Sequence, residues 1–462
     1  MSTAVLTVAQ MRAAEQSAMA SGVSEWELME RAGEGAAQWV ARVAGGRAVT
    51  VLCGPGNNGG DGYVIAETLR KSGLAVRVVA PVDPTTETAS KARASYAGPV
   101  DVAATLTDPI LVDCLFGYGL SRKVEGQFAE LLEQFGKSSS FKIAIDVPSG
   151  VMSDSGEWLA APYQCDLTLA LGAWKRAHWL MPGCAAMGEK RLVDIGLALD
   201  HDDVTLSDRP LLSAPAPDSH KYRRGLLAVV AGAMPGAPLL ACEAAMRAGA
   251  GYVKLLSDSS PTCSPPDLVV STSALGEALS DERIGAMLVG PGLGRDDAAR
   301  ERLATVLDAR ACAVIDADAL HLLDADMFEG VDASRICLTP HEGELAALCK
   351  AFDVTAEGKV EQATGLRDAI GTAILAKGPD TVLACADGRL TFFPRGSSWL
   401  SVAGSGDVLA GIIASRLAGH GDPARAAEEG VWLHSYAAAL AGPSFTASRL
   451  ASCVNRALAH FL

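Results

Sequence analysis

Aromatic residues are scarce in this sequence, and its cysteines follow no regular spacing. Aromatics account for 5% of the 462 residues, whereas there are 47 glycines. This composition favours close packing of helices on sheets over a β-sandwich with an aromatic core. The 11 cysteines are scattered and include no CxxC pair, which argues against a disulfide or zinc framework. We therefore expect reduced thiols and a cytoplasmic location.

Positive charge is in deficit. The chain carries 39 Lys and Arg against 54 Asp and Glu, which gives a formal net charge of −15. This charge repels phosphate-rich polymers, so a nucleic acid is not expected as a partner. A small phosphorylated ligand is compatible with it, because backbone N–H groups hold such ligands locally.

Long apolar runs and targeting signals are also lacking. The longest uncharged stretch, residues 225–242, is interrupted by prolines and glycines. The first residues contain no basic region followed by an apolar core. We therefore expect neither a membrane partner nor a targeting segment.

Apolar strand patterns alternate with helical patterns along the first half of the chain. Uninterrupted apolar runs are typical of strands that are buried on both faces. The alternation predicts an α/β fold, with a Rossmann-like doubly wound sheet in the N-terminal domain. The predicted strands cover residues 48–53, 75–80, 110–114, 141–147 and 166–171.

A stretch rich in Asp, Ser and Pro interrupts this pattern at residues 198–219. It has no helical period, which is typical of a domain boundary. The alternation of strands and helices starts again after it. We predict two α/β domains, residues 1–205 and 206–462.

The first glycine-rich loop follows a predicted strand and opens a helix. Residues 53–62 read CGPGNNGGDG. Glycines let the backbone approach a ligand closely, and a helix N-terminus offers free N–H groups to a phosphate. A glycine-rich turn without a ligand is the alternative interpretation. Two amides and an acid beside the glycines favour a binding site.

Two further clusters follow later strands of the first half. One reads DCLFGYGLSRK and begins at Asp113, and the other reads DVPSG and begins at Asp146. Loops at the carboxyl ends of parallel strands converge on one edge of the sheet. Asn58, Asp113 and Ser149 would then offer amide, carboxylate and hydroxyl or carbonyl oxygens, which suit a hard cation rather than zinc. The alternative is that both aspartates only cap the loops that follow them.

These residues resemble the N-terminal domain of the bacterial bifunctional NAD(P)H-hydrate repair enzymes. The likeness rests on GNNGGDGYVIA, VDCLFGYGL and AIDVPSG, and it spans roughly residues 1–205. It implies an epimerase that interconverts the R and S forms of hydrated NADH and NADPH. It also implies a potassium ion held by Asn58, Asp113 and Ser149.

The same resemblance implies substrate-binding residues. Asp146 would contact the substrate as an acid–base residue. Lys175 matches a lysine that the family often has, and its role is left open. The implied substrate-binding residues are Asn57, Asn58, Gly59, Gly60, Asp61, Gly117, Tyr118, Gly119, Leu120, Ser121, Arg122, Lys123 and Asp146.

A glycine–aspartate element opens a predicted helix in the second half, where Gly404-Ser-Gly-Asp407 leads into an apolar run. The N–H groups at such a helix start can form an anion hole for a moving phosphoryl group, and Asp407 can accept a proton from an attacking hydroxyl. The element is not a Walker A loop, because no lysine follows the glycines. Alternatively Asp407 is an N-cap residue, a role compatible with the first.

Other strand-end motifs surround this element in the predicted second domain. The basic run 220–225 marks either an anion site or a solvated run of charge. Glycine loops occupy residues 232–237 and 290–294. Asp316 and Asp318 follow another strand and are interpreted as shaping its end.

The second half resembles the ribokinase-like superfamily and, more narrowly, the ADP-dependent NAD(P)HX dehydratases. The likeness covers nearly all of residues 215–462. One departure is Ser405, where the family often has threonine, and the hydroxyl is kept. The motifs occur in the order HKYRRG, GAMPGAP, RAGAGYV, GPGLG, DADAL, LTPHEGE and GSGDVLAG.

This resemblance implies that Asp407 is the base that activates the hydroxyl of the hydrate. His341 is either a donor to a phosphate or a satisfied structural histidine. The implied contacts to the hydrated nucleotide are Ala237, Gly292, His341 and Asp407. The implied contacts to the adenine nucleotide are Lys377, Gly378, Pro379, Asp380, Thr381 and Gly406.

Together the two likenesses imply repair of hydrated NADH and NADPH: epimerisation in the N-terminal domain and ADP-dependent dehydration of the S form in the C-terminal domain. The expected partners are these hydrates and ADP, with magnesium for phosphoryl transfer, and the expected assembly is a homo-oligomer. Two alternatives stay open. One is a ribokinase-type kinase, such as a hydroxymethylpyrimidine kinase, with a regulatory N-terminal domain. The other is a non-catalytic nucleotide sensor.

Overall fold

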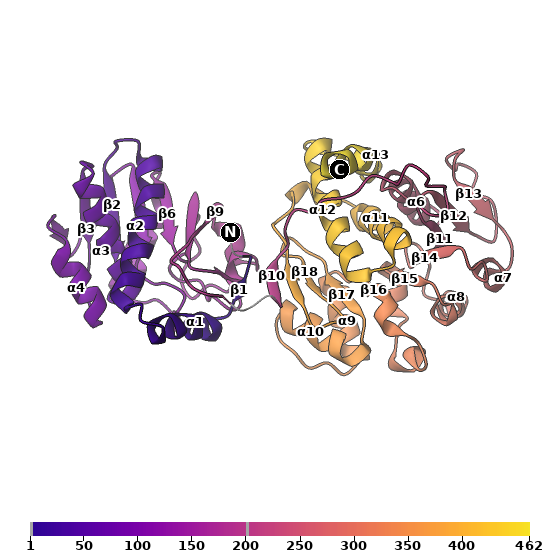
Figure 1. Ribbon diagram of the computed structural model, residues 1–462, viewed down its shortest axis with the longest axis horizontal. Coiled ribbons are helices and arrows are strands. Elements are labelled where there is room, and N and C mark those ends of the chain that lie inside the picture. The colour runs from indigo at the N-terminus through magenta and orange to yellow at the C-terminus, as the bar shows by residue number, and fades with distance from the viewer. Residues whose placement is uncertain (1–2, 200–202) are drawn as a thin grey trace. The chain divides into compact units, whose positions relative to one another are not determined.

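A parallel sheet of seven strands organises the first unit of the chain, Met1–Leu206 (Figure 1). The structure is a computed structural model that describes residues 3–199 and 203–462, so part of the predicted boundary stretch 198–219 lies outside the described residues. The strand order is β4-β3-β2-β5-β6-β7-β9, and every pairing is parallel. The strands are β2 Val49–Cys53, β3 Val76–Val79, β4 Val100–Asp101, β5 Ile110–Cys114, β6 Phe141–Ile145, β7 Leu167–Leu171 and β9 Glu189–Val193.

Helices cover both faces of this sheet. Successive side chains of a strand point to opposite faces, so Val51 of β2 packs in the cluster formed with α2 and α3, whereas Leu52 packs with Phe135 of α5. The prediction of a doubly wound sheet is confirmed. The helices are α1 Val8–Ala20, α2 Glu25–Ala44, α3 Asn57–Lys71, α4 Glu87–Ser95 and α5 Gln127–Lys137, and the short strands are β1 Val5–Leu6, β8 Trp174–Lys175 and β10 Val204–Leu206.

Two of these helices begin with a capping box that the sequence encodes. Thr7 accepts a hydrogen bond from the backbone of Gln10, whose side chain bonds back to Thr7, at the start of α1. Ser24 and Glu27 repeat the arrangement at the start of α2. The reciprocal bonds satisfy backbone N–H groups that a helix start leaves without a partner. They fix where both helices begin, and both helices line the site described below.

The order of the strands reverses between β2 and β5. At such a switch point the loops after the two strands diverge to opposite faces and leave a crevice at the carboxyl edge. The glycine-rich loop leaves β2 here, and the loop that starts at Leu115 leaves β5. Their backbones touch, because a Cβ added to Gly54 would lie 1.8 Å from the Leu115 carbonyl oxygen.

A second sheet organises the other unit, Ser207–Leu462. Within this unit the strand order is β19-β18-β17-β16-β15-β14-β11-β12-β13. The pairings of β18 with β17 and β19 are antiparallel, and the others are parallel. The strands are β11 Leu226–Val230, β12 Tyr252–Leu256, β13 Val269–Ser271, β14 Ile284–Val289, β15 Cys312–Ile315, β16 Ile336–Leu338, β17 Ala373–Ala376, β18 Val382–Ala384 and β19 Leu390–Phe392.

One group of helices in this unit packs around α11. This helix contacts α6 and α12, and α12 contacts α13 (Figure 1). The packed side chains form two apolar clusters, one that includes residues of the sheet and one formed mainly among α6, α11, α12 and α13. The helices are α6 Gly236–Arg247, α7 Leu275–Leu279, α8 Asp297–Asp308, α9 Glu342–Ala351, α10 Lys359–Ile370, α11 Ser405–His420, α12 Pro423–Ala441 and α13 Ala447–Phe461.

Three α-helices of this unit were not predicted from the sequence, α7, α10 and α13. Leu450, Val454 and Phe461 of α13 recur at helical spacing and are buried, so the sequence did carry the signal for this helix. In α10 only a few apolar side chains are buried, and a threonine and a glycine interrupt the apolar pattern. The buried residues are Val360, Ala363 and Leu366.

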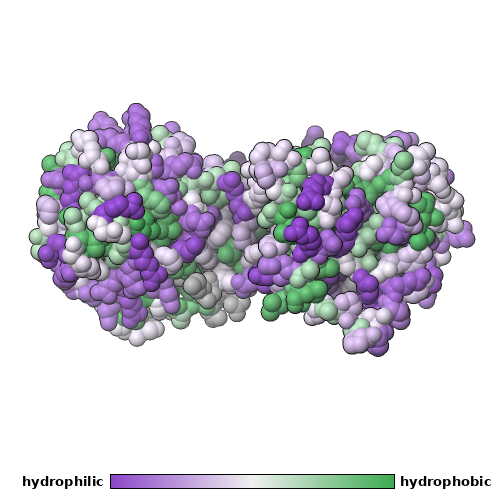
Figure 2. Space-filling model, turned by 90° about the horizontal axis from the view of Figure 1, so that it is seen from above, coloured by the Kyte–Doolittle hydropathy of each residue, from purple (hydrophilic) through white to green (hydrophobic). Residues whose placement is uncertain are grey.

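The described surface is mixed in character. Hydrophilic and hydrophobic residues are interspersed over the visible face of each unit (Figure 2). Large apolar side chains with more than half of their area exposed include Val102, Leu211, Met234 and Trp399. Among the described residues, no helix combines the length and apolar composition that crossing a bilayer requires.

The contact between the loops after β2 and β5 predicts the effect of one substitution. Gly54→Ala would force a Cβ against the Leu115 backbone, so we expect a loss of unfolding free energy of about 1–3 kcal/mol or more. Gly56→Ala is the matched control, because a Cβ there meets nothing within 4 Å and its φ is −95°. We expect it to change stability by less than about 0.5 kcal/mol in urea denaturation. Equal stability of the two variants would contradict the loop contact.

Candidate active sites

A cavity of about 680 Å³ opens at the carboxyl edge of the first sheet. Its walls come from α1, α2, the start of α3, the loop after β5 and the residue that follows β6. Most of the substrate-binding residues predicted from the sequence line it. They are Asn57, Asn58, Asp61, Gly117, Tyr118, Gly119, Leu120, Ser121, Arg122 and Asp146.

Three of the predicted residues, Gly59, Gly60 and Lys123, are not in the cavity lining. A Cβ on Gly59 would lie 1.9 Å from the Gly54 carbonyl oxygen, and one on Gly60 would lie 2.5 Å from the Met29 methyl group. These two glycines therefore permit close packing at the start of α3.

Asp146 stands at the cavity wall in a strained backbone conformation. Its φ is 68°, a left-handed value that costs a non-glycine residue of order 1–3 kcal/mol. Oδ1 accepts a hydrogen bond from Lys175 Nζ at 2.5 Å, and Oδ2 accepts one from the Tyr118 backbone N–H at 2.9 Å. Asp146 is 3% exposed, and Lys175 is fully buried. The carboxylate is therefore held in one orientation.

His178 ties the backbones of this pair together. The Lys175 N–H donates to His178 Nδ1 at 2.8 Å, so the proton of the neutral ring is on Nε2, which donates to the Asp146 carbonyl at 2.8 Å. Burial, with the nearby Lys175 charge, lowers the pKa of His178 to about 4. The ring is therefore neutral at pH 7. Sequence reasoning missed His178, whose only signal was its place three residues after Lys175.

Burial raises the pKa of two further carboxyl groups of the cavity, Glu15 and Asp61. Burial raises the pKa of Glu15, which accepts a hydrogen bond from the Tyr118 hydroxyl at 2.7 Å. Burial, followed by the charges of Asp146 and Glu15, raises the pKa of Asp61 well above its usual range. Glu15 lies on α1 and was not predicted as a site residue from the sequence.

The residues expected to hold potassium differ in whether their polar atoms already have hydrogen-bond partners. The buried side-chain amide of Asn58 has no hydrogen-bond partner, which is the state of a group that awaits a ligand. The Asp113 carboxylate instead accepts four hydrogen bonds, from the Leu115 and Ser149 backbones and from the Ser149 and Tyr163 hydroxyls. Burial still raises the pKa of Asp113. Asn58 therefore fits a cation site, and Asp113 mainly fixes Ser149.

In the second unit Asp407 lies in the first turn of α11. The N-cap residue of this helix is Gly404, with φ 87°, so the interpretation of Asp407 as the N-cap was wrong. The helix begins three residues earlier than an Asp407 cap would need, at a glycine in a left-handed conformation. Burial and the nearby Asp316 charge raise the pKa of Asp407 to about 6, and Lys377 opposes the shift.

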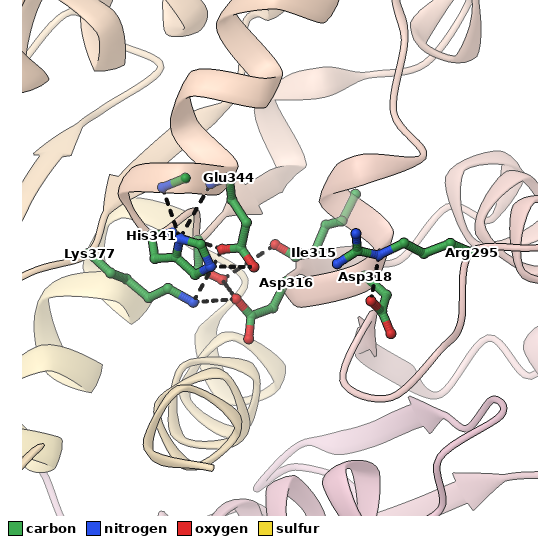
Figure 3. Close-up of polar contacts among 9 residues, drawn as sticks. Arg295, Ile315, Asp316, Asp318, His341, Glu344 and Lys377 are labelled. Atoms are coloured by element: carbon green, nitrogen blue, oxygen red, sulfur yellow. Dashed lines mark hydrogen bonds and ion pairs between the residues drawn. The ribbon is translucent and has the colours of Figure 1, made fainter. Parts of the chain in front are cut away.

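A network of charged groups faces this helix start. Figure 3 shows Lys377 and Asp316 pointing toward each other from the ends of β17 and β15. Lys377 Nζ lies 2.5 Å from Asp316 Oδ1 and 4.0 Å from Glu344 Oε2. A Cβ on Gly406 would lie 3.6 Å from Lys377 Nζ. The predicted nucleotide residues Lys377 and Gly406 are therefore neighbours of Asp407.

His341 is the N-cap residue of α9. Its Nδ1 accepts hydrogen bonds from the backbones of Gly343 and Glu344, at 3.0 and 3.3 Å, and Glu344 bonds back to His341 N. The side chain is 61% exposed. This geometry accounts for the ring as a structural cap, and its Nε2 lies 3.4 Å from Glu344 Oε1 (Figure 3).

The two glycine loops of this unit abut at the same edge. Met234 N–H donates to the Gly292 carbonyl at 2.9 Å, and Gly292 has φ 63°. A Cβ on Gly292 would lie 2.3 Å from the Met234 carbonyl oxygen. Ala237 is the second residue of α6, directly after this contact.

The predicted nucleotide segment 377–381 forms a turn after β17. Gly378 N–H and the Thr381 hydroxyl bond to each other across it, and Lys359 forms an ion pair with Asp380. The space around Gly378 is filled by these groups, since a Cβ there would meet Lys359 Nζ at 2.5 Å.

The basic run 220–225 precedes β11 and so begins at the amino end of a strand, opposite the loops just described. Arg223 pairs with Asp218, and Lys221 Nζ lies 4.8 Å from the centre of the Tyr252 ring. The structure gives this run local partners and does not bring it to the site.

Known protein families match both parts of the chain. A family model described as NAD(P)H-hydrate dehydratase matches residues 227–458, and one described as YjeF-related protein N-terminus matches residues 25–177. The bifunctional NAD(P)H-hydrate repair enzyme of Coxiella burnetii is 32% identical over 93% of each chain. That of Thermofilum pendens is 33% identical over 85% of this chain and 83% of its own.

A solved structure also resembles the chain in part. It is the ADP/ATP-dependent NAD(P)H-hydrate dehydratase from Bacillus subtilis, co-crystallised with ATP/Mg2+. It is 29% identical, with 55% of this chain and 95% of that chain covered and a TM-score of 0.46.

The ionisation of Asp407 predicts how stability depends on pH. Because its folded pKa of about 6 exceeds the ordinary 3.8, its protonation favours the folded state. That contribution is full below about pH 4 and is lost as the pH rises through about 6. Asp407→Asn should therefore unfold at a higher temperature than the wild type at pH 8, and the two should converge towards pH 4.

Asp332→Asn is the control of opposite sign. Asp332 lies in the same unit, and a hydrogen bond from Ser334 lowers its pKa. Its favourable contribution is present above the ordinary pKa, so Asp332→Asn should not raise the unfolding temperature at pH 8. A wild type that is more stable than Asp407→Asn at pH 8 would contradict the burial of an ionised Asp407.

Proposed function

The chain belongs to the family of bifunctional NAD(P)H-hydrate repair enzymes, and from that premise we propose which residues carry each of its two reactions. It is an epimerase and a dehydratase that repairs hydrated NADH and NADPH. We assign epimerisation of the R and S hydrates to residues 1–205, and dehydration of the S form to residues 206–462. The cavity at β2 and β5 supports the first assignment, and the Asp407 cluster supports the second.

Dehydration must overcome a poor leaving group. The hydrate carries a hydroxyl on a saturated ring carbon, and hydroxide leaves such a carbon slowly. Attack of that hydroxyl oxygen on the terminal phosphorus of ADP breaks the bond to AMP and places a phosphate ester on the ring. Breaking the carbon–oxygen bond then releases phosphate, loss of a proton from the adjacent carbon restores the ring double bond, and the products are NAD(P)H, AMP and phosphate.

Asp407 is the general base of the first step in this proposal. It accepts the hydroxyl proton as the oxygen attacks phosphorus. A base works best when its pKa lies near the working pH, and the pKa of Asp407 is raised to about 6. The single observation that carries the proposal is this half-buried carboxylate in the first turn of α11, beside Lys377.

The same helix start would hold the transferred phosphoryl group. Backbone N–H groups in the first turn of a helix point outwards and carry partial positive charge. Lys377 adds a full positive charge beside Gly406. Phosphoryl transfer requires little beyond such positioning and charge neutralisation. The turn 377–381 would bind the rest of the adenine nucleotide, and Ala237, Gly292 and His341 the hydrated nucleotide.

Magnesium is expected with the nucleotide, but this chain offers it no preformed cage. Within residues 3–199 and 203–462 no cluster of three or more His, Cys, Asp or Glu side chains is placed to hold a metal ion. Magnesium is commonly held mostly by substrate phosphates and water. We therefore assign it no protein ligand.

In the first unit we propose Asp146 as the acid–base residue of the epimerase. Hydrogen bonds from Lys175 and from the Tyr118 N–H hold its carboxylate in one orientation at the cavity wall. Potassium would bind at the free Asn58 amide with Ser149 and Asp113 behind it, and it would supply positive charge next to the substrate. The loop 117–123 and residues 57–61 would hold the substrate.

Asp407→Asn should abolish dehydration while ADP binding survives. Loss of a general base lowers the rate about 10²–10⁴-fold. The measurement is recovery of the NADH absorbance band from S-hydrate with ADP, with ADP affinity measured by calorimetry.

In the wild type the rate should fall as the pH drops through about 6, because Asp407 becomes protonated. A variant that turns over at the wild-type rate would remove Asp407 from the mechanism, and accumulation of a stable phosphorylated product by the wild type would indicate a kinase.

Asp146→Asn should affect only the epimerase. From a mixture of R and S hydrates, recovery of the absorbance should stop near the S fraction, because the second unit still dehydrates that form. Its remaining dehydratase activity shows that the chain is folded. Mixing this variant with Asp407→Asn should restore full recovery, since each supplies the site that the other lacks. Failure of the mixture, with both variants folded, would contradict the division of labour.

A further inference from the structure

Asp316 is an almost completely buried acid beside the proposed dehydratase site, and the reaction steps proposed for that site do not use it. It is 1% exposed and follows β15 directly. Its Oδ1 accepts hydrogen bonds from the Thr339 hydroxyl at 2.8 Å and from Lys377 Nζ at 2.5 Å. A buried carboxylate is costly unless it is paired and hydrogen-bonded, and here it is both.

The backbone around Asp316 is fixed from two sides. Its N–H donates to the Val289 carbonyl at 3.1 Å. A Cβ on Gly290 would lie 1.7 Å from the Asp316 carbonyl oxygen, so only glycine permits this approach. Ala317 has φ 50°, a left-handed conformation that is strained for alanine. Such strain persists where the surrounding structure imposes it, so the backbone beside Asp316 is held in one conformation.

The partner of Asp316 stands at the start of α11. Lys377 Nζ lies 3.6 Å from the position that a Cβ on Gly406 would take. Lys377 has four rotatable side-chain bonds, so it needs a fixed acceptor to keep its ammonium group there. The Asp316 carboxylate is the closer of its two acidic neighbours, with Glu344 4.0 Å away.

We propose that Asp316 is a positioning residue for dehydration, one that holds the Lys377 ammonium at the amino end of α11 beside Asp407. The proposal rests on the function assigned above to this site. Asp316 touches neither reactant. Asp316 sets the position of the Lys377 ammonium group relative to the phosphoryl group. A displacement of a catalytic group by about 1 Å can lower the rate about 10²-fold.

The charges that face Asp407 come from three segments. Asp316 and Asp318 follow β15, Lys377 follows β17, and the N-terminus of α11 itself carries positive partial charge. His434 of α12 is neutral, because burial lowers its pKa to about 4. Asp316 is the largest charge effect on Asp407, ahead of Lys377. Removing it should lower the pKa of Asp407, even where Lys377 moves away and offsets part of the shift.

Asp318 provides the matched control. It lies two residues further along the chain and also raises the pKa of Asp407, to a smaller extent. Its carboxylate binds Arg295 Nε at 2.8 Å and the Gly294 N–H at 3.1 Å, and it makes no contact with Lys377 in Figure 3. Asp318→Asn therefore removes the same charge from the same segment without releasing Lys377.

The experiment is a double-mutant cycle on the full chain, with S-hydrate and ADP as probes. We expect Asp316→Asn to lower kcat at least tenfold, and Asp318→Asn to lower it less than threefold. The double variant Asp316→Asn/Lys377→Met should be no slower than Lys377→Met alone, because Asp316 acts through that lysine. An unchanged kcat in Asp316→Asn, or effects that multiply in the double variant, would overturn the proposal.

The pH profile separates positioning from a merely structural role. The acid limb of kcat should move to lower pH in Asp316→Asn, whereas a structural defect would reduce the folded fraction and leave the limb in place. If Asp316→Asn does not fold, Thr339→Val tests the same point, since it removes one hydrogen bond to Asp316 Oδ1 and keeps the charge. It should lower kcat severalfold, and a wild-type kcat would count against the proposal.

Failure of the proposed function gives a different result. A wild type that binds ADP in calorimetry without any turnover would overturn the dehydratase assignment. The ionisation of Asp407 stays measurable in that case, from the pH at which the thermal stabilities of wild type and Asp407→Asn diverge. When both proteins also carry Asp316→Asn, their thermal stabilities should diverge at a lower pH. Divergence at the same pH would overturn the link between Asp316 and Asp407.

Discussion

Each unit builds its site around an ion pair between a buried aspartate and a lysine at the ends of its strands. Lys175 Nζ lies 2.5 Å from Asp146 Oδ1 in the first unit, and Lys377 Nζ lies 2.5 Å from Asp316 Oδ1 in the second. Burying two charges costs several kcal/mol per ion unless close geometry and further hydrogen bonds offset it. A backbone N–H supplies the further bond in the first unit, and a threonine hydroxyl in the second. These partners fix the charged groups before any ligand binds.

The pairs also divide the carboxyl groups of each site into two kinds. The paired aspartates have a lysine beside them, while burial raises the pKa of Glu15 and Asp61 in the first unit and of Asp407 in the second. Burial holds His178 and His434 neutral, with each pKa near 4. The carboxyl groups, rather than the histidines, are therefore the titrating groups that suit proton transfer.

Motifs at strand ends were the part of the site that the sequence predicted well. Parallel strands bring their carboxyl ends together, so loops such as those at Asn58 and Tyr118 share one cavity although they are distant in the chain. Glu15 was missed, because it reaches the cavity from α1 rather than from a loop at a strand end. Asp407 lies at a helix start as predicted, but the alternative that it is the N-cap residue was wrong, because the left-handed turn at Gly404 depends on its tertiary surroundings. His178 was missed because its role comes from the backbone groups that it bridges.

The central claim is that one chain carries two complementary repair activities. The most direct test incubates the wild-type protein with an equal mixture of R and S hydrates of NADH, with potassium, magnesium and either ADP or ATP, and follows the NADH absorbance band. The account predicts complete recovery in the presence of a nucleotide and none without one. Recovery that stops at the S fraction would contradict the epimerase assignment, and no recovery with either nucleotide would contradict the account as a whole.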